Sequence, residues 1–382
     1  MLGRVIQIRG LPLLLVCILM LVSYPSGIAS SSQSSSVTSM DVAYAQAQIA
    51  KFRSIPHFTA PASPFNARKA MTGRTIVSIP VTSELPITVI LESTMAGVAK
   101  KLGFRFVQWQ NQGRSDQWVQ GMRYAIQQHA SVIDLLAIPP GLLKPQIDEA
   151  RKAGIKVVSS HFAGLGQQQV SYIDGAVLLP YGEVGKLEAD WAIAHTNAHV
   201  DALAVVANDL QSTQAVVDGI KSEFAHHCHN RCSVKFVNVA TTNWATGVQP
   251  VVAAALQSDP NLNYVIPIYD AMSQFALAAI TAAQKSGQVQ MDTFNGTPFA
   301  LGLIAKGQLQ MDIGENEDWV GRGMIDYEMR LAARMIPPSD EGFPLYIWDR
   351  GNVINAGTPP QSSKGYGTAY ISGYDRLWGL NT

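Results

Sequence analysis

The sequence predicts an α/β fold made of two doubly wound parallel-sheet lobes. From Thr75 onward, short apolar runs alternate with longer amphipathic stretches, and this succession occurs twice along the chain. Strands that alternate with helices in this way form parallel sheets with helices on both faces. The length of 382 residues also leaves room for two cores of ordinary domain size.

The first succession runs from residue 76 to residue 160. Its strands are short apolar runs, and its helices carry apolar residues three and four positions apart. Gly103 and Gly154 each follow a predicted helix, as is typical of helix C-termini. The predicted strands are Ile76–Val81, Phe104–Trp109, Val132–Ile138 and Lys156–Ser160, and the helices are Val89–Leu102, Asp116–Gln128 and Leu142–Ala153.

The second succession begins at Gly185 and repeats the same alternation of strands and helices. In its stretch FNGTP, Gly296 and Pro298 indicate a turn that leads into a helix and presents Asn295 to a cleft; a turn with Asn295 bonded only to its own backbone is the alternative. The predicted strands are Ala202–Ala207, Val234–Val239, Tyr264–Ile268 and a short strand before Asn295, and the helices are Gly185–His195, Gln214–Ala225, Val248–Gln257, Ala271–Lys285 and Phe299–Lys306.

Composition and charge exclude several classes of protein. With 47% hydrophobic and 15% charged residues, the chain is globular rather than disordered. The formal net charge is zero, and the loss of Arg4 and Arg9 with a cleaved leader would leave about 0 − 2 = −2. A chain without a basic excess lacks the electrostatic footprint of a nucleic-acid-binding protein.

Residues 1–29 are typical of a cleaved export signal. Arg4 and Arg9 precede an apolar run from Leu13 to Val22, and small residues follow. A membrane anchor is the alternative, although the run is shorter than the roughly 20 residues of a membrane span. Residues 30–73 contain several prolines, and we interpret them as an extension that wraps or tethers the body.

The two cysteines beyond this leader, Cys228 and Cys232, lie in the stretch HHCHNRC. An oxidising compartment favours a disulfide between them, while free thiols and a metal site remain open alternatives. Zinc ligands usually come from two segments, and this is a single cluster. His195 and His199 have the spacing of a metal pair on one helix, but no third ligand is placed beside them.

The sequence motifs of common enzymes are missing. The stretch GLGQQQ at residue 164 lacks the third glycine of a dinucleotide-binding motif, and neither G-x-S-x-G nor H-E-x-x-H occurs. We therefore predict that the protein is not an enzyme and that it uses no cofactor and no metal.

Polar and aromatic residues instead follow the predicted strands in both successions. The carboxyl ends of parallel strands are where ligands bind in open α/β sheets. Aromatic rings cover the C–H faces of a polyol, and amide or carboxylate groups bond its hydroxyls. The strand-end residues are Thr82, Ser83, Glu84, Gln110, Asn111, His161 and Phe162 in the first lobe, and Asn208, Asp209, Asn243, Trp244, Tyr269, Asp270, Asn295, Glu315 and Asn316 in the second.

Four stretches in collinear order resemble the periplasmic sugar-binding proteins of ABC transporters, of the ribose-binding type. They begin GVAKKLGFRFVQWQNQGRSDQWVQGM, IDEARKAGIKVVSS, SDPNLNYVIPIYDAMSQFALAAI and FNGTPFALGLIAKGQLQMDIGENEDWVGRGM. The resemblance covers about residues 75–345. It implies the periplasmic-binding-protein type 1 fold, in which a three-segment hinge joins the two lobes.

The resemblance also implies boundaries. The crossings between lobes should fall near 179–181, 314–316 and 347–350. The first lobe should comprise residues 74–180 plus 316–346. The second lobe and the C-terminal tail should comprise residues 181–315 plus 347–382.

The resemblance also identifies the ligand-binding positions of the family in this sequence, and several of them hold a different residue here. His161 and Phe162 stand where the family has an Asp-Arg pair, Asn295 stands for an Asp, and Glu315 stands for a hinge Gln. Tyr269 replaces an Asn, Ile87 and Thr88 replace an aromatic pair, and Val216 replaces an Arg, so the family's bidentate clamps are missing. The predicted ligand-binding residues are Ser83, Glu84, Thr88, His161, Phe162, Trp244, Tyr269, Asn295 and Glu315.

The expected function is that of an exported solute-binding protein that captures a small carbohydrate or sugar-like solute and presents it to an ABC permease. The expected location is the periplasm or the extracytoplasmic face of a bacterial cell. A sensor accessory for a membrane receptor is the main alternative. An exported enzyme is disfavoured because the enzyme motifs are missing. A sugar-responsive repressor is disfavoured because it would carry a DNA-binding helix pair ahead of this fold, where this sequence has the predicted export signal.

Overall fold

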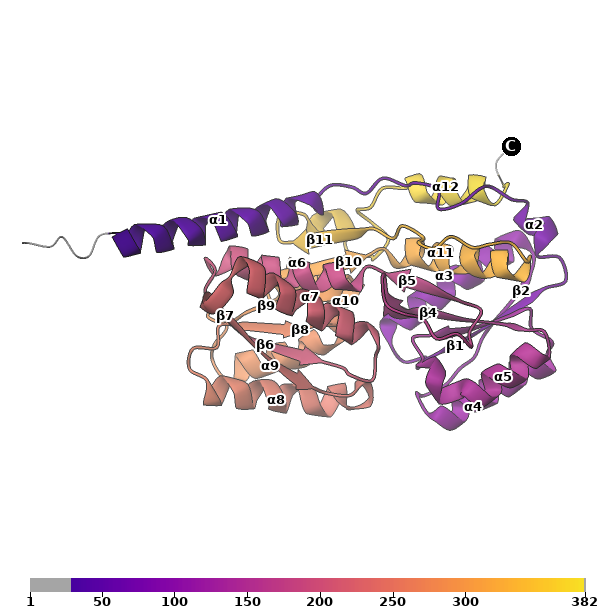
Figure 1. Cartoon of the computed structure of the whole chain (residues 1–382), viewed down its shortest axis with the longest axis horizontal. Helices are drawn as coiled ribbons and strands as arrows, with labels where there is room; N and C mark the ends of the chain where they lie inside the picture. Colours follow the sequence, from indigo (N-terminus) through magenta and orange to yellow (C-terminus); the bar gives the residue numbers. More distant parts are fainter. Residues whose placement is uncertain (1–28, 381–382) are drawn as a thin grey trace, which may run out of the picture. The chain divides into compact units, whose positions relative to one another are not determined.

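Two β-sheets organise the chain, and helices cover both faces of each sheet in the computed structural model (Figure 1). The structure describes residues 29–380, with side chains from residue 38 onward. Residues 38–380 belong to one compact unit, whose fold is described below. Of the preceding unit, residues 1–37, only the start of helix α1 (Ala29–Lys51) is described, so residues 1–28 of the predicted export signal lie outside the described part.

The first sheet contains five parallel strands in the order β2-β1-β3-β4-β5. Every residue of β3 is buried, as expected for a parallel strand with helices on both sides. The strands are β1 (Thr75–Pro80), β2 (Arg105–Gln108), β3 (Val132–Leu136), β4 (Lys156–Gly164) and β5 (Gly175–Leu179).

Side chains of β1 alternate between two cores of the first lobe. Ile79 belongs to the core that includes Met122 and Ile147, on the helices α4 (Ser115–Gln127) and α5 (Lys144–Lys152). Ile76 belongs to the opposite core, with Leu91 on α3 (Pro86–Leu102). The helix α11 (Glu317–Ala332) packs beside α3 on that second face (Figure 1).

The second sheet contains six strands in the order β11-β10-β9-β8-β6-β7, in which only β11 runs antiparallel to its neighbour. With the first sheet, it confirms the predicted fold of two doubly wound lobes. The strands are β6 (Val200–Val206), β7 (Cys232–Asn238), β8 (Tyr264–Pro267), β9 (Gln290–Asn295), β10 (Met311–Glu315) and β11 (Leu345–Asp349).

Helices again cover both faces of the second sheet (Figure 1). On one face, α6 and α7 cross closely at two glycines, Gly185 and Gly219. On the other face, α8 packs against α9. The helices are α6 (Tyr181–His195), α7 (Ser212–His227), α8 (Trp244–Ser258), α9 (Ser273–Ala282) and α10 (Pro298–Ala305), and the short 3₁₀ turns are η1 (Pro140–Leu143), η2 (His229–Arg231), η3 (Thr241–Asn243), η4 (Asp270–Met272) and η5 (Val353–Ala356).

The chain passes between the two sheets at three places. It leaves the first sheet between β5 and α6, and it returns between β10 and α11. The third crossing lies between Ala332 and Leu345, ahead of the 347–350 position that the sequence indicated. It comes earlier because Leu345 already pairs with Glu315 in the antiparallel β10–β11 ladder.

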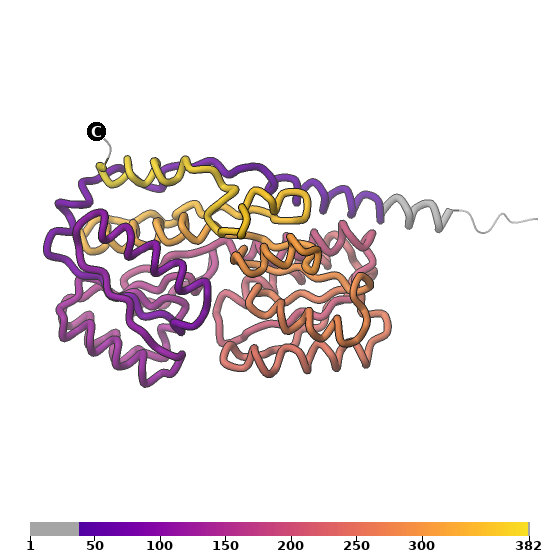
Figure 2. Tube along the Cα trace, turned by 180° about the vertical axis from the view of Figure 1, so that it is seen from behind, coloured from indigo at the N-terminus to yellow at the C-terminus, as the bar shows by residue number. Residues whose placement is uncertain are grey.

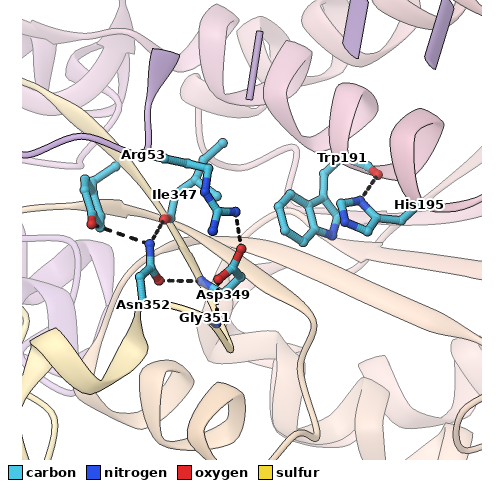
Figure 3. Close-up of polar contacts among 8 residues, drawn as sticks. Arg53, Trp191, His195, Ile347, Asp349, Gly351 and Asn352 are labelled. Atoms are coloured by element: carbon cyan, nitrogen blue, oxygen red, sulfur yellow. Dashed lines mark hydrogen bonds and ion pairs between the residues drawn. The ribbon is translucent and has the colours of Figure 1, made fainter. Parts of the chain in front are cut away.

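The N-terminal strap, residues 38–71, lies along both lobes. Its first part contacts the second lobe: Asp41 pairs with Arg231, Tyr44 stacks on His227 at 3.6 Å between ring centroids, and the carbonyl of Phe52 accepts from the backbone N–H of Ile347 at 2.8 Å. Figure 3 shows the next contact, in which Arg53 reaches the carboxylate of Asp349, while Asn352 and Gly351 hold the turn after β11.

The second part of the strap contacts the first lobe. The ring of Phe58 packs against Trp319 and Tyr374, at 5.6 and 5.1 Å between centroids. The backbone N–H of Phe65 donates to Leu377 at 2.9 Å, just before the short helix α2 (Ala67–Ala70). The partner here is α12 (Ala369–Leu377), which packs on α11 and runs beside the strap in Figures 1 and 2. The 347–382 segment therefore begins on the second lobe and ends on the first.

Among the helices of residues 29–380, none is both long enough and apolar enough to span a membrane.

Candidate functional site

A cavity lies between the two lobes, at the carboxyl ends of strands from both sheets. Its empty volume is about 570 Å³, part of which is open to solvent. Ligand pockets in α/β proteins occur at this position. The lining residues are Val81, Leu85, Pro86, Ile87, Thr88, Ala137 and His161 from the first lobe, and Tyr181, Leu210, Ser212, Trp244, Tyr269, Asp270, Ala271, Asn295 and Thr297 from the second.

Three strand ends that line this cavity have left-handed backbone conformations. The φ angles are 59° at Ala137, 50° at His161 and 137° at Asn295. Residues other than glycine rarely adopt positive φ, and such residues cluster at binding and catalytic sites. In the stretch FNGTP, a Cβ atom on Gly296 would lie 2.6 Å from the Cα atom of Gly314, so only glycine lets β9 end this close to β10.

Glu315 connects this strand end to the first lobe. Its Oε1 lies 2.7 Å from Nε2 of His161 and accepts from Nδ2 of Asn295 at 2.9 Å. The other ring nitrogen of His161, Nδ1, lies 3.0 Å from the hydroxyl of Tyr181. Glu315 ends β10 and Tyr181 begins α6, so two of the three crossing segments meet at His161.

The charge on His161 follows from these contacts. Burial alone would lower the pKa of the imidazole, but the carboxylate of Glu315 and its hydrogen bond outweigh burial and raise that pKa above its ordinary value. The raised pKa favours the protonated imidazole, which would form a buried ion pair with the carboxylate of Glu315 at the hinge.

Two aromatic rings form one wall of the cavity. Trp244 and Tyr269 stack with 6.0 Å between centroids and 27° between planes. The indole N–H of Trp244 donates to the carbonyl of Val239 at 3.1 Å, and the hydroxyl of Tyr269 lies 2.7 Å from Oγ of Ser212. These bonds fix the positions of the two rings in the lining of the cavity.

Asp270 supplies a carboxylate to the same cavity. Its side chain is only 2% exposed, and Oδ2 accepts from the backbone N–H of Thr297 at 2.9 Å. Burial raises the pKa of Asp270 to about 7, and the nearby charge of Glu315 adds to the rise.

The structure brings most of the predicted residues to the cleft. Thr88, His161, Trp244, Tyr269 and Asn295 line the cavity, and Glu315 bonds two of them. Glu84 lines a wider adjoining mouth.

The remaining two predicted residues lie elsewhere. The hydroxyl of Ser83 bonds the backbone of Asn111 at 3.1 Å, and Phe162 is buried outside the cavity lining. Tyr181, Ser212, Asp270 and Thr297 line the cavity although they were not among the predicted binding residues. Their common signal is that each stands within the first turn of a helix that follows a strand, or just before it.

The cysteines and histidines singled out in the sequence lie outside the cleft. A disulfide joins Cys228 and Cys232, with 5.5 Å between their Cα atoms. His195 and His199 each donate from Nδ1 to a backbone carbonyl, of Trp191 and Asn197. Across residues 38–380, no three His, Cys, Asp or Glu side chains are arranged to hold a metal ion.

Two parallel-sheet lobes around one shared cleft define the class of two-lobed solute-binding proteins. Residues 77–333 match the periplasmic binding protein domain. The chain therefore belongs to the periplasmic binding protein family, whose members bind solutes outside the cytoplasm and are not enzymes. No curated protein sequence matches the chain.

Solved structures of low sequence identity share the fold. An ABC transporter solute-binding protein from Actinobacillus succinogenes with bound D-allose has a TM-score of 0.63 at 18% identity, over 74% of this chain and 99% of the other. A carbohydrate transporter protein from Acidothermus cellulolyticus with myo-inositol has 0.63 at 20%, over 77% and 99%. A solute-binding protein from Agrobacterium vitis with allitol has 0.65 at 16%, over 74% and 97%.

Proposed function

We propose that this protein is the solute-binding component of an ABC importer and that it captures a small carbohydrate-like solute in the interlobe cleft. The observation that carries the proposal is one cavity lined by both lobes at their strand ends. A solute in that cavity would contact Val81 and His161 on one side and Trp244 and Asn295 on the other. Because only the closed arrangement offers both sets of contacts, the solute would stabilise closure.

The chemistry of the wall supports a sugar-like solute. Trp244 and Tyr269 can cover the C–H face of a ring, while Asn295 and Asp270 can bond hydroxyls. The proteins of similar fold described above bind D-allose, myo-inositol and allitol, which share this combination of C–H and hydroxyl groups. The predicted export signal agrees with delivery of the solute to a permease at the outer face of the cytoplasmic membrane.

A thermal-shift screen of the purified protein against monosaccharides and polyols tests this function. A solute at 100 times its Kd should stabilise the protein by about 2.7 kcal/mol and raise its Tm. Trp244→Leu should abolish the shift. Trp109→Leu is the matched control, because Trp109 also donates its indole N–H to a backbone carbonyl, at 2.9 Å from Gln117, but lies away from the cavity.

Transport and turnover separate the remaining possibilities. Deletion of the gene in its host should abolish uptake of the solute that gives the shift. Uptake that persists while a signalling response is lost would favour the sensor alternative. Conversion of the solute by the purified protein would overturn the proposal.

A further inference from the structure

Buried carboxyl groups outnumber cationic groups in and beside the lining of the cavity. None of the sixteen residues that line the cavity is lysine or arginine. The imidazole of His161 is the single basic group in that lining, and Glu315, at 2.7 Å, already pairs with it. The lining therefore has no second cation with which to balance Asp270.

Asp270 lacks a cationic partner within the protein. None of the ion pairs among residues 38–380 includes it, and its hydrogen bonds come from neutral groups of Thr297 and Ala271. A carboxylate that is 2% exposed and unpaired costs free energy, because buried charges are normally paired. The rise in the pKa of Asp270 to about 7, caused first by burial, reflects this cost.

The surroundings of Asp270 add negative rather than positive charge. Asp312 and Glu317 are fully buried nearby, and burial, together with the charge of Asp270, raises the pKa of each well above its ordinary value. The raised pKa values favour the neutral forms of these two groups, which leaves the carboxyl groups of Asp270 and Glu315 to interact with a charged solute. An anionic solute would be repelled by both.

The aromatic wall suits a cation as well as a sugar ring. The stacked residues Trp244 and Tyr269 line the same cavity as Asp270. The electron-rich face of an indole or phenol ring attracts an ammonium group, and more strongly where water is excluded.

We infer that the solute held in this cleft carries an ammonium group, which binds Asp270 against the aromatic wall of Trp244 and Tyr269. The inference rests on the proposed function and narrows it from carbohydrate-like solutes in general to amino-substituted sugars and polyols. Glu315 is already occupied by His161, so Asp270 is the carboxylate that the ammonium group would reach. A neutral sugar would leave this charge unpaired, and a sugar acid would add another of the same sign.

Pairs of sugars that differ only in an amine or a hydroxyl test the inference. Calorimetric titration at pH 7, where the amino sugars are mainly in their ammonium forms, would compare D-glucosamine with D-glucose, D-galactosamine with D-galactose, and D-mannosamine with D-mannose. In at least one pair the amine should bind about tenfold or more tighter than the hydroxyl, since charge-assisted hydrogen bonds exceed neutral ones by about that factor.

Two variants assign the preference to one residue. Asp270→Asn keeps an acceptor for Thr297 and should reduce the amine preference to less than about twofold. Asp292→Asn is the matched control, because Asp292 is also a buried acid of raised pKa, bonded by Tyr264 at 2.8 Å, but lies outside the cavity lining. The control should keep the preference.

The outcomes distinguish this inference from the proposed function. If the hydroxyl sugars bind as tightly as the amines, the inference is wrong while the carbohydrate-binding function stands. An amine preference that survives in Asp270→Asn likewise overturns the role of Asp270. If no member of any pair binds but a neutral sugar of the wider screen does, the inference is wrong and the proposed function stands. If the wider screen also fails, both are overturned.

Discussion

Helices α6 and α7 cross at Gly185, where the structure leaves no room for a methyl group. A Cβ atom there would lie 2.0 Å from the carbonyl oxygen and 2.8 Å from the carbonyl carbon of Val216. Ordinary contacts begin at 3.4 Å, so the helices would have to separate by about 3.4 − 2.0 = 1.4 Å. The obstacle is backbone and cannot rotate away. Gly219 faces the same crossing from α7, with 2.4 Å between its added Cβ and the carbonyl oxygen of Gly182.

We expect Gly185→Ala to destabilise the protein. Overpacking costs about 3 kcal/mol at the upper end of its usual range, and the better helix propensity of alanine returns about 1 kcal/mol. The net loss of about 2 kcal/mol should lower the Tm by roughly 3 °C. Tyr181 and Ser212, which begin these helices, line the cavity, so solute affinity should fall as well.

Differential scanning calorimetry of two variants measures this effect. Gly97→Ala is the matched control, because Gly97 also lies within a helix and an added Cβ there meets no atom within 4 Å. That variant should be as stable as the parent or more stable by up to about 1 kcal/mol. If Gly185→Ala melts at the parental temperature, the close crossing does not constrain the second lobe and the reasoning fails.

Two further predictions concern the hinge and the strap. In the parent protein, the stability contributed by the His161–Glu315 pair should be full below about pH 6.5 and should be lost as the pH rises through the raised pKa of His161. Glu315→Gln should remove that loss from a series of Tm measurements between pH 6 and 9; an unchanged slope would contradict the assignment. Arg53→Ala should cost less than about 1 kcal/mol in urea unfolding, because the side chain of Arg53 is 37% exposed and its pair with Asp349 is screened. Phe58→Ala should cost about 2 kcal/mol through lost packing on Trp319 and Tyr374, so an equal effect of both variants would contradict an aromatic anchor.

Most strands and helices could be predicted from hydropathy because their buried faces are apolar. Two elements escape such a pattern. In β10, Asp312 and Glu315 are buried, so the strand does not read as an apolar run. In α11, Asp326, Glu328 and Arg330 are buried together with most of the helix, which removes the polar stripe of an amphipathic helix. Buried polar residues therefore remove the hydropathy pattern from which β10 and α11 could have been predicted.

The sequence predicted that the site lies at the strand ends, but it did not predict which side chains point into the cavity. His161 and Phe162 are adjacent in β4, but φ is 50° at His161 and the pairing of β4 with β5 shifts register beyond Ser160, so the regular alternation of a strand does not give their side-chain directions. Ser83 follows β1 as expected, but its hydroxyl bonds the loop at Asn111 instead of facing the cavity. Asp270 was recognisable as a strand-end residue, whereas its lack of a cation depends on residues from several strands.

The strap and the C-terminal helix bear on how far the lobes can part. In the described chain the lobes share the three crossings, the strap, and the segment from β11 to α12. Figures 1 and 2 show the strap, α11 and α12 along one edge of the described unit and α4 and α8 at the opposite edge. The wide mouth of the cleft is lined by Trp118 on α4 and Phe275 on α9. A connection close to a hinge changes length little for a given opening angle, while one across the mouth would have to stretch. The added connections can therefore stabilise the hinge edge without opposing the proposed opening, and the contacts of the solute with both lobes remain the interactions that distinguish the closed state.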